Sequence, residues 1–178
     1  MKTNYIYNPF VRIAGYEALL IGLLTFLATC FFAFKTGTHF IGLSEVSFAK
    51  DAPFWFFFIE NLIAWLSLSV FVFIIGLFLS KSRIRFCDVL GTLLLARVPL
   101  IIVPCLRLTP AFQSFIVGSW QLQLTNIIYY LSMIWTLVLV FNAIKVSCNL
   151  KEKKLIIVFI VSVLLAEVIS ITVINNLN

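Results

Sequence analysis

The chain has 178 residues, of which 62% are hydrophobic and only 11% are charged, and its mean hydropathy is +1.12. Soluble domains are roughly half apolar and a quarter charged. This composition therefore excludes an ordinary water-soluble domain and predicts an integral membrane protein, with the lipid bilayer as its first partner and no nucleic acid among the others.

Five stretches are long and apolar enough to cross a bilayer, which takes ~20 mainly apolar residues in a helix. They lie near residues 14–34, 54–80, 87–106, 126–146 and 155–174. We find no internal repeat and no linker, so we expect one all-α domain of five spans over residues 1–178. In the connection 107–125, "AFQSFIVGSWQL" fits either a short interfacial helix or a loop anchored by Trp120.

The first span carries small residues at close to helical spacing. They are Ala14, Ala18, Gly22, Thr25, Thr29 and Ala33. Small residues let helix backbones approach closely inside a membrane. The stripe therefore predicts a packing face, either against another span of the same chain or against a second copy in a homo-oligomer.

Basic residues gather in the connections that five alternating spans place on one side. They are Lys2, Arg12, Lys81, Arg83, Arg85, Lys145, Lys151, Lys153 and Lys154. A basic excess marks the cytoplasmic side of a membrane protein. We therefore expect a cytoplasmic N-terminus and an outside C-terminus. The basic residues of the two short loops are also candidates to hold anionic lipid headgroups; they are Lys81, Arg83, Arg85, Lys151, Lys153 and Lys154.

The third span contains an arginine and two prolines, within "LLLARVPLIIVP". Proline lacks a backbone N–H, so Pro99 should free the carbonyl of Leu95 and bend the helix, and Pro104 should act similarly. Such a bend is either architectural or a way to expose backbone carbonyls to a transported substrate.

Three ionisable residues lie deep in the expected spans. At ~1.5 Å of rise per residue, Arg97 lies about 15 Å and Glu167 about 18 Å from the cytoplasmic ends of their helices, while Glu60 lies roughly 10 Å below the outside. Charges at such depth are costly and should face the bundle with a partner. Matching depth predicts that Glu167 pairs with Arg97, with Glu60 joining the polar cluster. This cluster is either a functional cavity or an ion pair that locks the helices together.

Catalytic and metal-binding signals are weak. Four cysteines and one histidine, His39, do not have the spacing of a zinc site, and we expect no metal or cofactor. A disulfide between Cys30 and Cys105 is an alternative to free thiols. The chain has no HExxH motif, no facing aspartate pair and no nucleophile paired with a base. We therefore expect no enzymatic activity.

The third span, "DVLGTLLLARVPLII", followed by "WTLVLVFNAIKVSCNL" and "KKLIIVFIVSVLLAEVIS", resembles the Yip membrane-domain family of Ypt/Rab-interacting proteins. The likeness is most specific at Asp88, Gly91, Ala96, Arg97 and Pro99. It implies the same five-span plan and orientation.

For a eukaryotic member of this family, the resemblance implies a protein of the ER or Golgi membrane. Such a protein associates with prenylated Rab-type GTPases and has a long cytosolic N-terminal region. Here residues 1–13 alone precede the expected first span, so GTPase binding is not carried over. The chain is most similar to the short bacterial members, which implies a bacterial cytoplasmic membrane, with ER or Golgi as the alternative.

Two hypotheses of function follow. The first is a non-enzymatic scaffold or adaptor that binds other membrane proteins, in membrane organisation or trafficking. The second is a small transporter or channel that uses Arg97, Glu167 and Glu60, with Pro99 as its bend.

Overall fold

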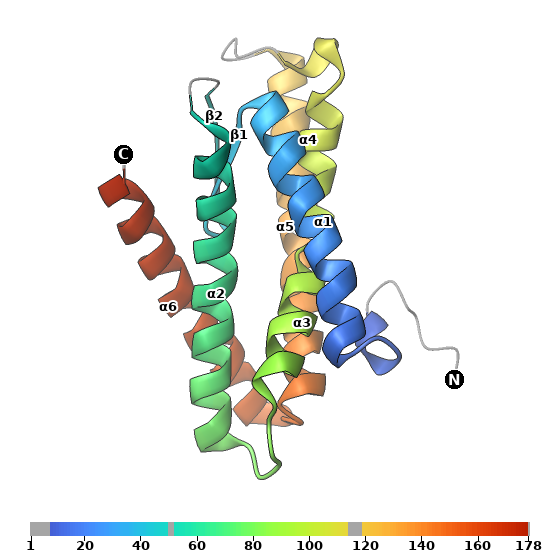
Figure 1. The fold of residues 1–178 in the computed structure, drawn as a ribbon, viewed down its shortest axis with the longest axis vertical. Coiled ribbons are helices and arrows are strands. Elements are labelled where there is room, and N and C mark those ends of the chain that lie inside the picture. The colour runs from blue at the N-terminus through green and yellow to red at the C-terminus, as the bar shows by residue number, and fades with distance from the viewer. Residues whose placement is uncertain (1–7, 50–51, 114–118, 178) are drawn as a thin grey trace.

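The computed structural model describes residues 8–49, 52–113 and 119–177 (Figure 1). Within these residues it has five helical spans that are long and apolar enough to cross a membrane, as the sequence predicts. Four are single helices: α1 (Gly15–Thr36), α2 (Phe54–Leu79), α5 (Trp120–Ser147) and α6 (Glu152–Leu177). The third span is built from α3 (Phe86–Ala96), the 3-10 turn η2 (Val98–Ile101) and α4 (Ile102–Arg107).

Two short 3-10 turns complete the helical elements, η1 (Pro9–Val11) and η3 (Pro110–Phe112). Helix α5 begins at Trp120 rather than near residue 126, because Ser119 caps it by accepting a hydrogen bond from the Leu122 N–H at 3.4 Å. The choice between an interfacial helix and a loop anchored by Trp120 depends on residues 114–118, which lie outside the described residues.

The third span is the centre of the bundle. In its most apolar window 67% of the residues are buried, against 22% for α6. It packs against α1 on one side and α5 on another, while α6 packs mainly on α2 and tilts away from it toward the C-terminal end (Figure 1). Helix α6 is therefore the most peripheral span.

Most of the small-residue stripe of the first span faces the inside of the chain. Ala18, Gly22, Thr29 and Ala33 are buried, whereas Thr25 is partly exposed and Ala14, which precedes the helix, is exposed. Helix α1 packs mainly on α3. A Cβ on Gly22 would lie 3.0 Å from the Leu95 nitrogen, and one on Gly91 would lie 2.6 Å from the Gly15 carbonyl oxygen. The two backbones thus approach closely.

Asp88 lies beside the start of α1, because a Cβ on Gly15 would lie 3.1 Å from its Oδ1. The helix dipole favours a negative charge at this position.

The third span is interrupted at Arg97, which ends α3. A 3-10 turn replaces the α-helix over Val98–Ile101 and includes Pro99, which has no N–H for the carbonyl of Leu95. Helix α4 then resumes, and Pro104 falls in its first turn, where a missing N–H leaves no intrahelical bond unmade.

The connection between α1 and α2 contains an antiparallel hairpin that the all-α expectation missed. Strands β1 (Thr38–Ile41) and β2 (Glu45–Phe48) pair with Ile41 opposite Glu45. Strand β1 is mostly buried and contacts α1, α2 and α6. The hairpin thus folds back between the helices and is not a loop on the surface (Figure 1).

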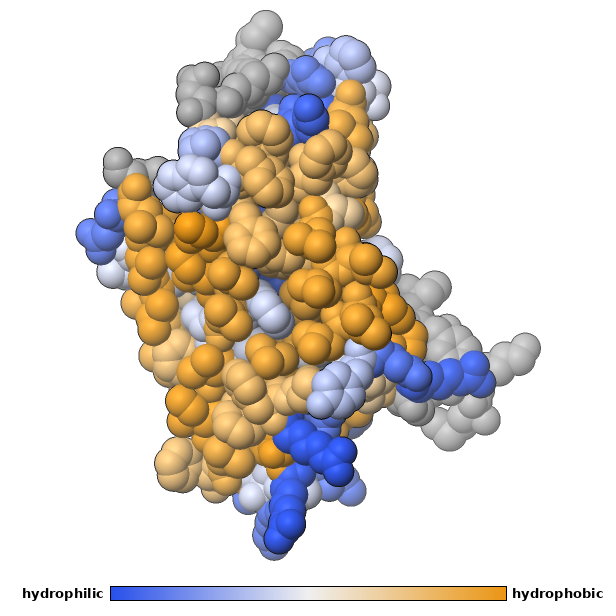
Figure 2. All heavy atoms as spheres, in the orientation of Figure 1, coloured by the Kyte–Doolittle hydropathy of each residue, from blue (hydrophilic) through white to orange (hydrophobic). Residues whose placement is uncertain are grey.

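Figure 2 shows an apolar surface across the middle of the molecule and hydrophilic residues toward its two ends. This distribution is the one expected of a helical bundle with an outer surface in contact with lipid. We refer below to the end that carries the loops 80–85 and 148–151 as the basic end, and to the opposite end as the hairpin end.

We predict that Gly91→Ala weakens the contact between α1 and α3. Its Cβ would press on backbone atoms, at 2.6 Å from the Gly15 oxygen and 2.9 Å from the Leu19 nitrogen. Overpacking of this kind costs about 1–3 kcal/mol, so thermal unfolding in detergent should begin at a lower temperature. Gly76→Ala is the matched control, since its Cβ would meet only side-chain atoms, of Cys148 and Ile84, at 3.1 Å. Equal stability of the two variants would contradict the prediction.

Candidate functional site

Glu167 binds the tip of the hairpin. One carboxylate oxygen accepts a hydrogen bond from the Leu43 N–H at 2.9 Å, and the other accepts one from the Ser44 N–H at 2.9 Å and one from the Ser44 hydroxyl. The Tyr129 hydroxyl of α5 donates to the Leu43 carbonyl at 2.9 Å. Two helices therefore satisfy polar backbone groups of the turn, in which Leu43 is buried and Ser44 is exposed.

The turn brings Gly42 directly against the carboxylate. Its φ of +77° is the left-handed conformation that glycine adopts without strain, and a Cβ there would lie 2.5 Å from Glu167 Oε2. Position 42 is thus restricted twice, by backbone conformation and by the closeness of Glu167.

Glu60 forms a buried pair with His39 of strand β1. Each of the two carboxylate oxygens lies 3.1 Å from His39 Nδ1, and both side chains are almost fully buried. When Glu60 is ionised it can only accept, so Nδ1 carries the proton. The imidazole also stacks on the Phe57 ring, with centroids 4.3 Å apart. The pair joins the hairpin to α2.

A groove of about 410 Å³ lies next to this pair at the hairpin end. His39 and Glu60 contribute polar groups to it, while Trp55, Phe56 and Leu177 contribute apolar walls. The Nε2 atom of His39 is buried without a hydrogen-bond partner among the described residues. The groove therefore combines an apolar wall with a hydrogen-bonding imidazole.

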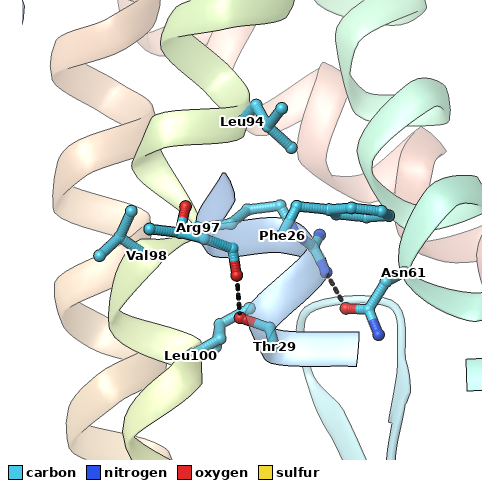
Figure 3. A pocket seen from close by; sticks show the side chains of 8 residues that line it. Phe26, Thr29, Asn61, Leu94, Arg97, Val98 and Leu100 are labelled. Carbon is cyan, nitrogen blue, oxygen red and sulfur yellow. Dashed lines mark hydrogen bonds between the residues drawn. The ribbon is translucent and has the colours of Figure 1, made fainter. Parts of the chain in front are cut away.

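Arg97 lies at the break in the third span, and its side chain is 6% exposed. Its Nη2 donates to Asn61 Oδ1 of α2 at 3.4 Å (Figure 3). The Asn61 amide in turn donates to the Phe57 carbonyl at 3.0 Å. Arg97 Nη1 has no hydrogen-bond partner in the part of the chain that the structure describes. A cavity of about 10 Å³ adjoins the guanidinium, which is room for about one water molecule.

The expected ion pair between Arg97 and Glu167 is not formed. Matching depth along two helices does not fix the direction in which their side chains point, and Glu167 points to the hairpin. The two side chains interact only at longer range, through their charges. The three residues predicted as one cluster thus belong to separate contacts, with Asn61, His39 and the hairpin tip respectively.

Two further buried polar residues, Arg107 and His39, were not predicted from the sequence as site residues. Arg107 is fully buried at the end of α4, donates to the Phe112 carbonyl at 3.2 Å, and lies over the Phe48 ring at 4.1 Å from its centroid. His39 lies between the first two expected spans, where no strand was predicted. The sequence does contain a signal for the hairpin. Two four-residue runs, "THFI" and "EVSF", flank a short segment with Gly42, and this pattern is typical of hairpins.

All four cysteines are free, so Cys30 and Cys105 form no disulfide. Burial raises the pKa of the Cys148 thiol, just past the end of α5, which keeps it neutral and poorly nucleophilic. Among the described residues no group of three or more His, Cys, Asp or Glu side chains is placed to hold a metal ion.

The predicted lipid-binding residues all lie at the basic end. Lys81, Lys151 and Lys154 line one cavity there, and Lys154 donates to the Leu79 carbonyl at 3.0 Å. Arg83 and Arg85 lie in the loop between α2 and α3, and Lys153 lies in the first turn of α6, without lining the cavity.

Comparison with protein-family models, curated proteins and solved structures found no match to this chain.

We predict that Glu167→Leu loosens the hairpin. It leaves the N–H of the buried Leu43 without an acceptor, which should cost about 1–3 kcal/mol of stability, and it frees the exposed Ser44 N–H. Hydrogen–deuterium exchange of these two amides should become faster than in the wild type. Glu152→Leu removes an exposed carboxylate from the same helix and is the control. Unchanged exchange in Glu167→Leu would show that the carboxylate does not hold the turn.

We predict that His39 and Glu60 depend on each other energetically. His39→Leu and Glu60→Leu should each lower the free energy of unfolding by about 3–5 kcal/mol, since each leaves a buried polar partner behind. The double variant should cost less than the sum by about 1–3 kcal/mol. A parallel cycle with Arg97→Leu and Glu167→Leu should show a smaller coupling. A larger coupling in the second cycle would reverse the assignment of partners.

Proposed function

We propose that this chain is an integral membrane protein without enzymatic activity, a scaffold or adaptor in membrane organisation or trafficking. Its five-span plan and the residues Asp88, Gly91, Ala96, Arg97 and Pro99 are similar to the Yip family. We place it in the bacterial cytoplasmic membrane, with ER or Golgi as the alternative. The basic end faces the cytoplasm in this proposal, in line with the excess of basic residues there.

The observation that carries the proposal is that the ionisable side chains inside the bundle bind the chain itself. Glu167 holds the hairpin tip, Glu60 holds His39, and Arg97 contacts Asn61 beside a cavity of about 10 Å³. A space of that size does not admit a hydrated ion. Because these interior charges hold the fold together, the outer surface of the bundle is the part that is available to bind other molecules.

Helix α6 is the span best placed to receive a partner helix. It has the lowest buried share of the five, and it packs mainly on α2. Leu164 and Val168 are 60% and 62% exposed and lie one helical turn apart. In our proposal, a span of another membrane protein packs along this face.

Site-specific photo-crosslinking in native membranes tests this role. We expect a crosslinker at Leu164 or Val168 to give a discrete protein adduct that mass spectrometry identifies reproducibly. Leu20 and Leu24 of α1 are matched controls, because they are 64% and 70% exposed, and they should give lipid adducts alone. Lipid adducts alone from all four positions would contradict a scaffold that acts through α6.

A transporter or channel is the second candidate, and one observation favours it. The buried His39–Glu60 pair lines a groove of about 410 Å³, so a titratable pair adjoins a space that a solute could enter. This candidate requires proton or ion flux into proteoliposomes above that of empty vesicles, reduced in Glu60→Gln. Flux equal to that of empty vesicles would exclude it.

A further inference from the structure

A second cavity lies at the basic end, where the loop between α2 and α3 meets the loop between α5 and α6. Its volume is about 360 Å³. The polar groups that line it come from both loops and from the first turn of α6; they are Ser80, Lys81, Ser82, Asn149, Lys151 and Lys154. Segments far apart in the sequence therefore build one polar hollow.

The lining of this cavity has a single sign of charge. Three ammonium groups line it, and no acidic side chain is among the described residues that do so. The nearest acidic residue in sequence, Glu152, is exposed and does not contribute. Hydroxyl groups of two serines and an asparagine amide supply further donors. Such a set of donors is complementary to an anion with several oxygens, such as a phosphate group.

Local hydrogen bonds hold several of these donors in place. Lys154 donates to the carbonyl of Leu79 at 3.0 Å, which keeps its ammonium group at the cavity. The Ser82 N–H donates to Ser80 Oγ at 3.1 Å, and the two serine hydroxyls lie 2.9 Å apart. A lining that is ordered before binding loses less freedom when a ligand arrives.

The surroundings of the cavity favour a lipid over a free anion. The last turn of α2 exposes Leu77 and Phe78, the latter at 84%, and the first turns of α6 expose Ile156 and Ile157. Apolar surface thus borders the hydrophilic end (Figure 2). A phospholipid needs both features together, donors for its phosphate and an apolar wall for its acyl chains.

We propose that this cavity binds the phosphate of an anionic membrane lipid, with its acyl chains along α2 and α6. Lys81, Lys151 and Lys154 neutralise the phosphate, and one serine hydroxyl and the Asn149 amide donate to its oxygens. The site is independent of the partner-binding role proposed for α6, because it requires no second protein.

The test is lipid binding by the purified full-length chain, measured by native mass spectrometry and by titration of phosphatidylglycerol into nanodiscs of phosphatidylcholine. The first variant combines Lys81→Gln, Lys151→Gln and Lys154→Gln. The control combines Arg83→Gln, Arg85→Gln and Lys153→Gln, which removes the same charge from the same loop regions but spares the cavity. Thermal unfolding in phosphatidylcholine alone checks that both variants remain folded.

We expect the cavity variant to bind phosphatidylglycerol roughly a hundredfold more weakly than the wild type, and the control to stay close to the wild type. Equal losses in both variants would mean that charge attracts lipid without a site, and would overturn the proposal. Saturable binding of inorganic phosphate that is lost in the cavity variant, while phosphatidylglycerol binding in that variant is unchanged, would assign the cavity to a free anion and would also overturn the proposal. Neither result bears on crosslinking at α6.

Discussion

The structure depends on the carboxylate of Glu167 at the tip of the hairpin. The turn of the hairpin presents N–H and C=O groups that neither a helix nor a sheet satisfies, and Gly42 and Leu43 in it are buried away from water. Hydrogen bonds between the two strands satisfy the backbone of the strands, but they do not satisfy the backbone of the turn. Glu167 accepts from two of its N–H groups, and Tyr129 donates to one of its carbonyls.

This contact also explains how the peripheral helix stays in register. Helix α6 has few buried positions, and apart from α2 it makes limited contact with the bundle. Glu167 joins it to residues more than a hundred positions earlier in the chain. A hydrogen bond between Ser67 and Ser170, at 3.3 Å, adds a second polar contact between α6 and α2. These directional bonds add to the packing of the buried face of α6 in fixing the rotation of the helix about its axis.

The sequence predicts the helices well and the partners of the charged residues poorly, for a physical reason. Hydropathy measures whether a helix can lie in lipid, and the rise per residue gives the depth of a side chain along it. Neither gives the direction in which the side chain points. Arg97 and Glu167 were matched on depth alone, whereas the structure directs one to Asn61 and the other to the hairpin. Glu60 is buried in α2, but its partner, His39, lies in a hairpin for which no element was predicted.

The two sets of charged residues differ in what the fold requires of them. Glu60, Arg97 and Glu167 hold elements together, so their removal strands buried groups. In the loops at the basic end, Lys81 and Lys151 are exposed, and Lys154 makes one bond to a backbone carbonyl. The fold would form with little loss if these lysines were neutral. Their convergence on one cavity without an acidic residue is therefore not explained by stability, whereas a bound anion explains both their position and their sign.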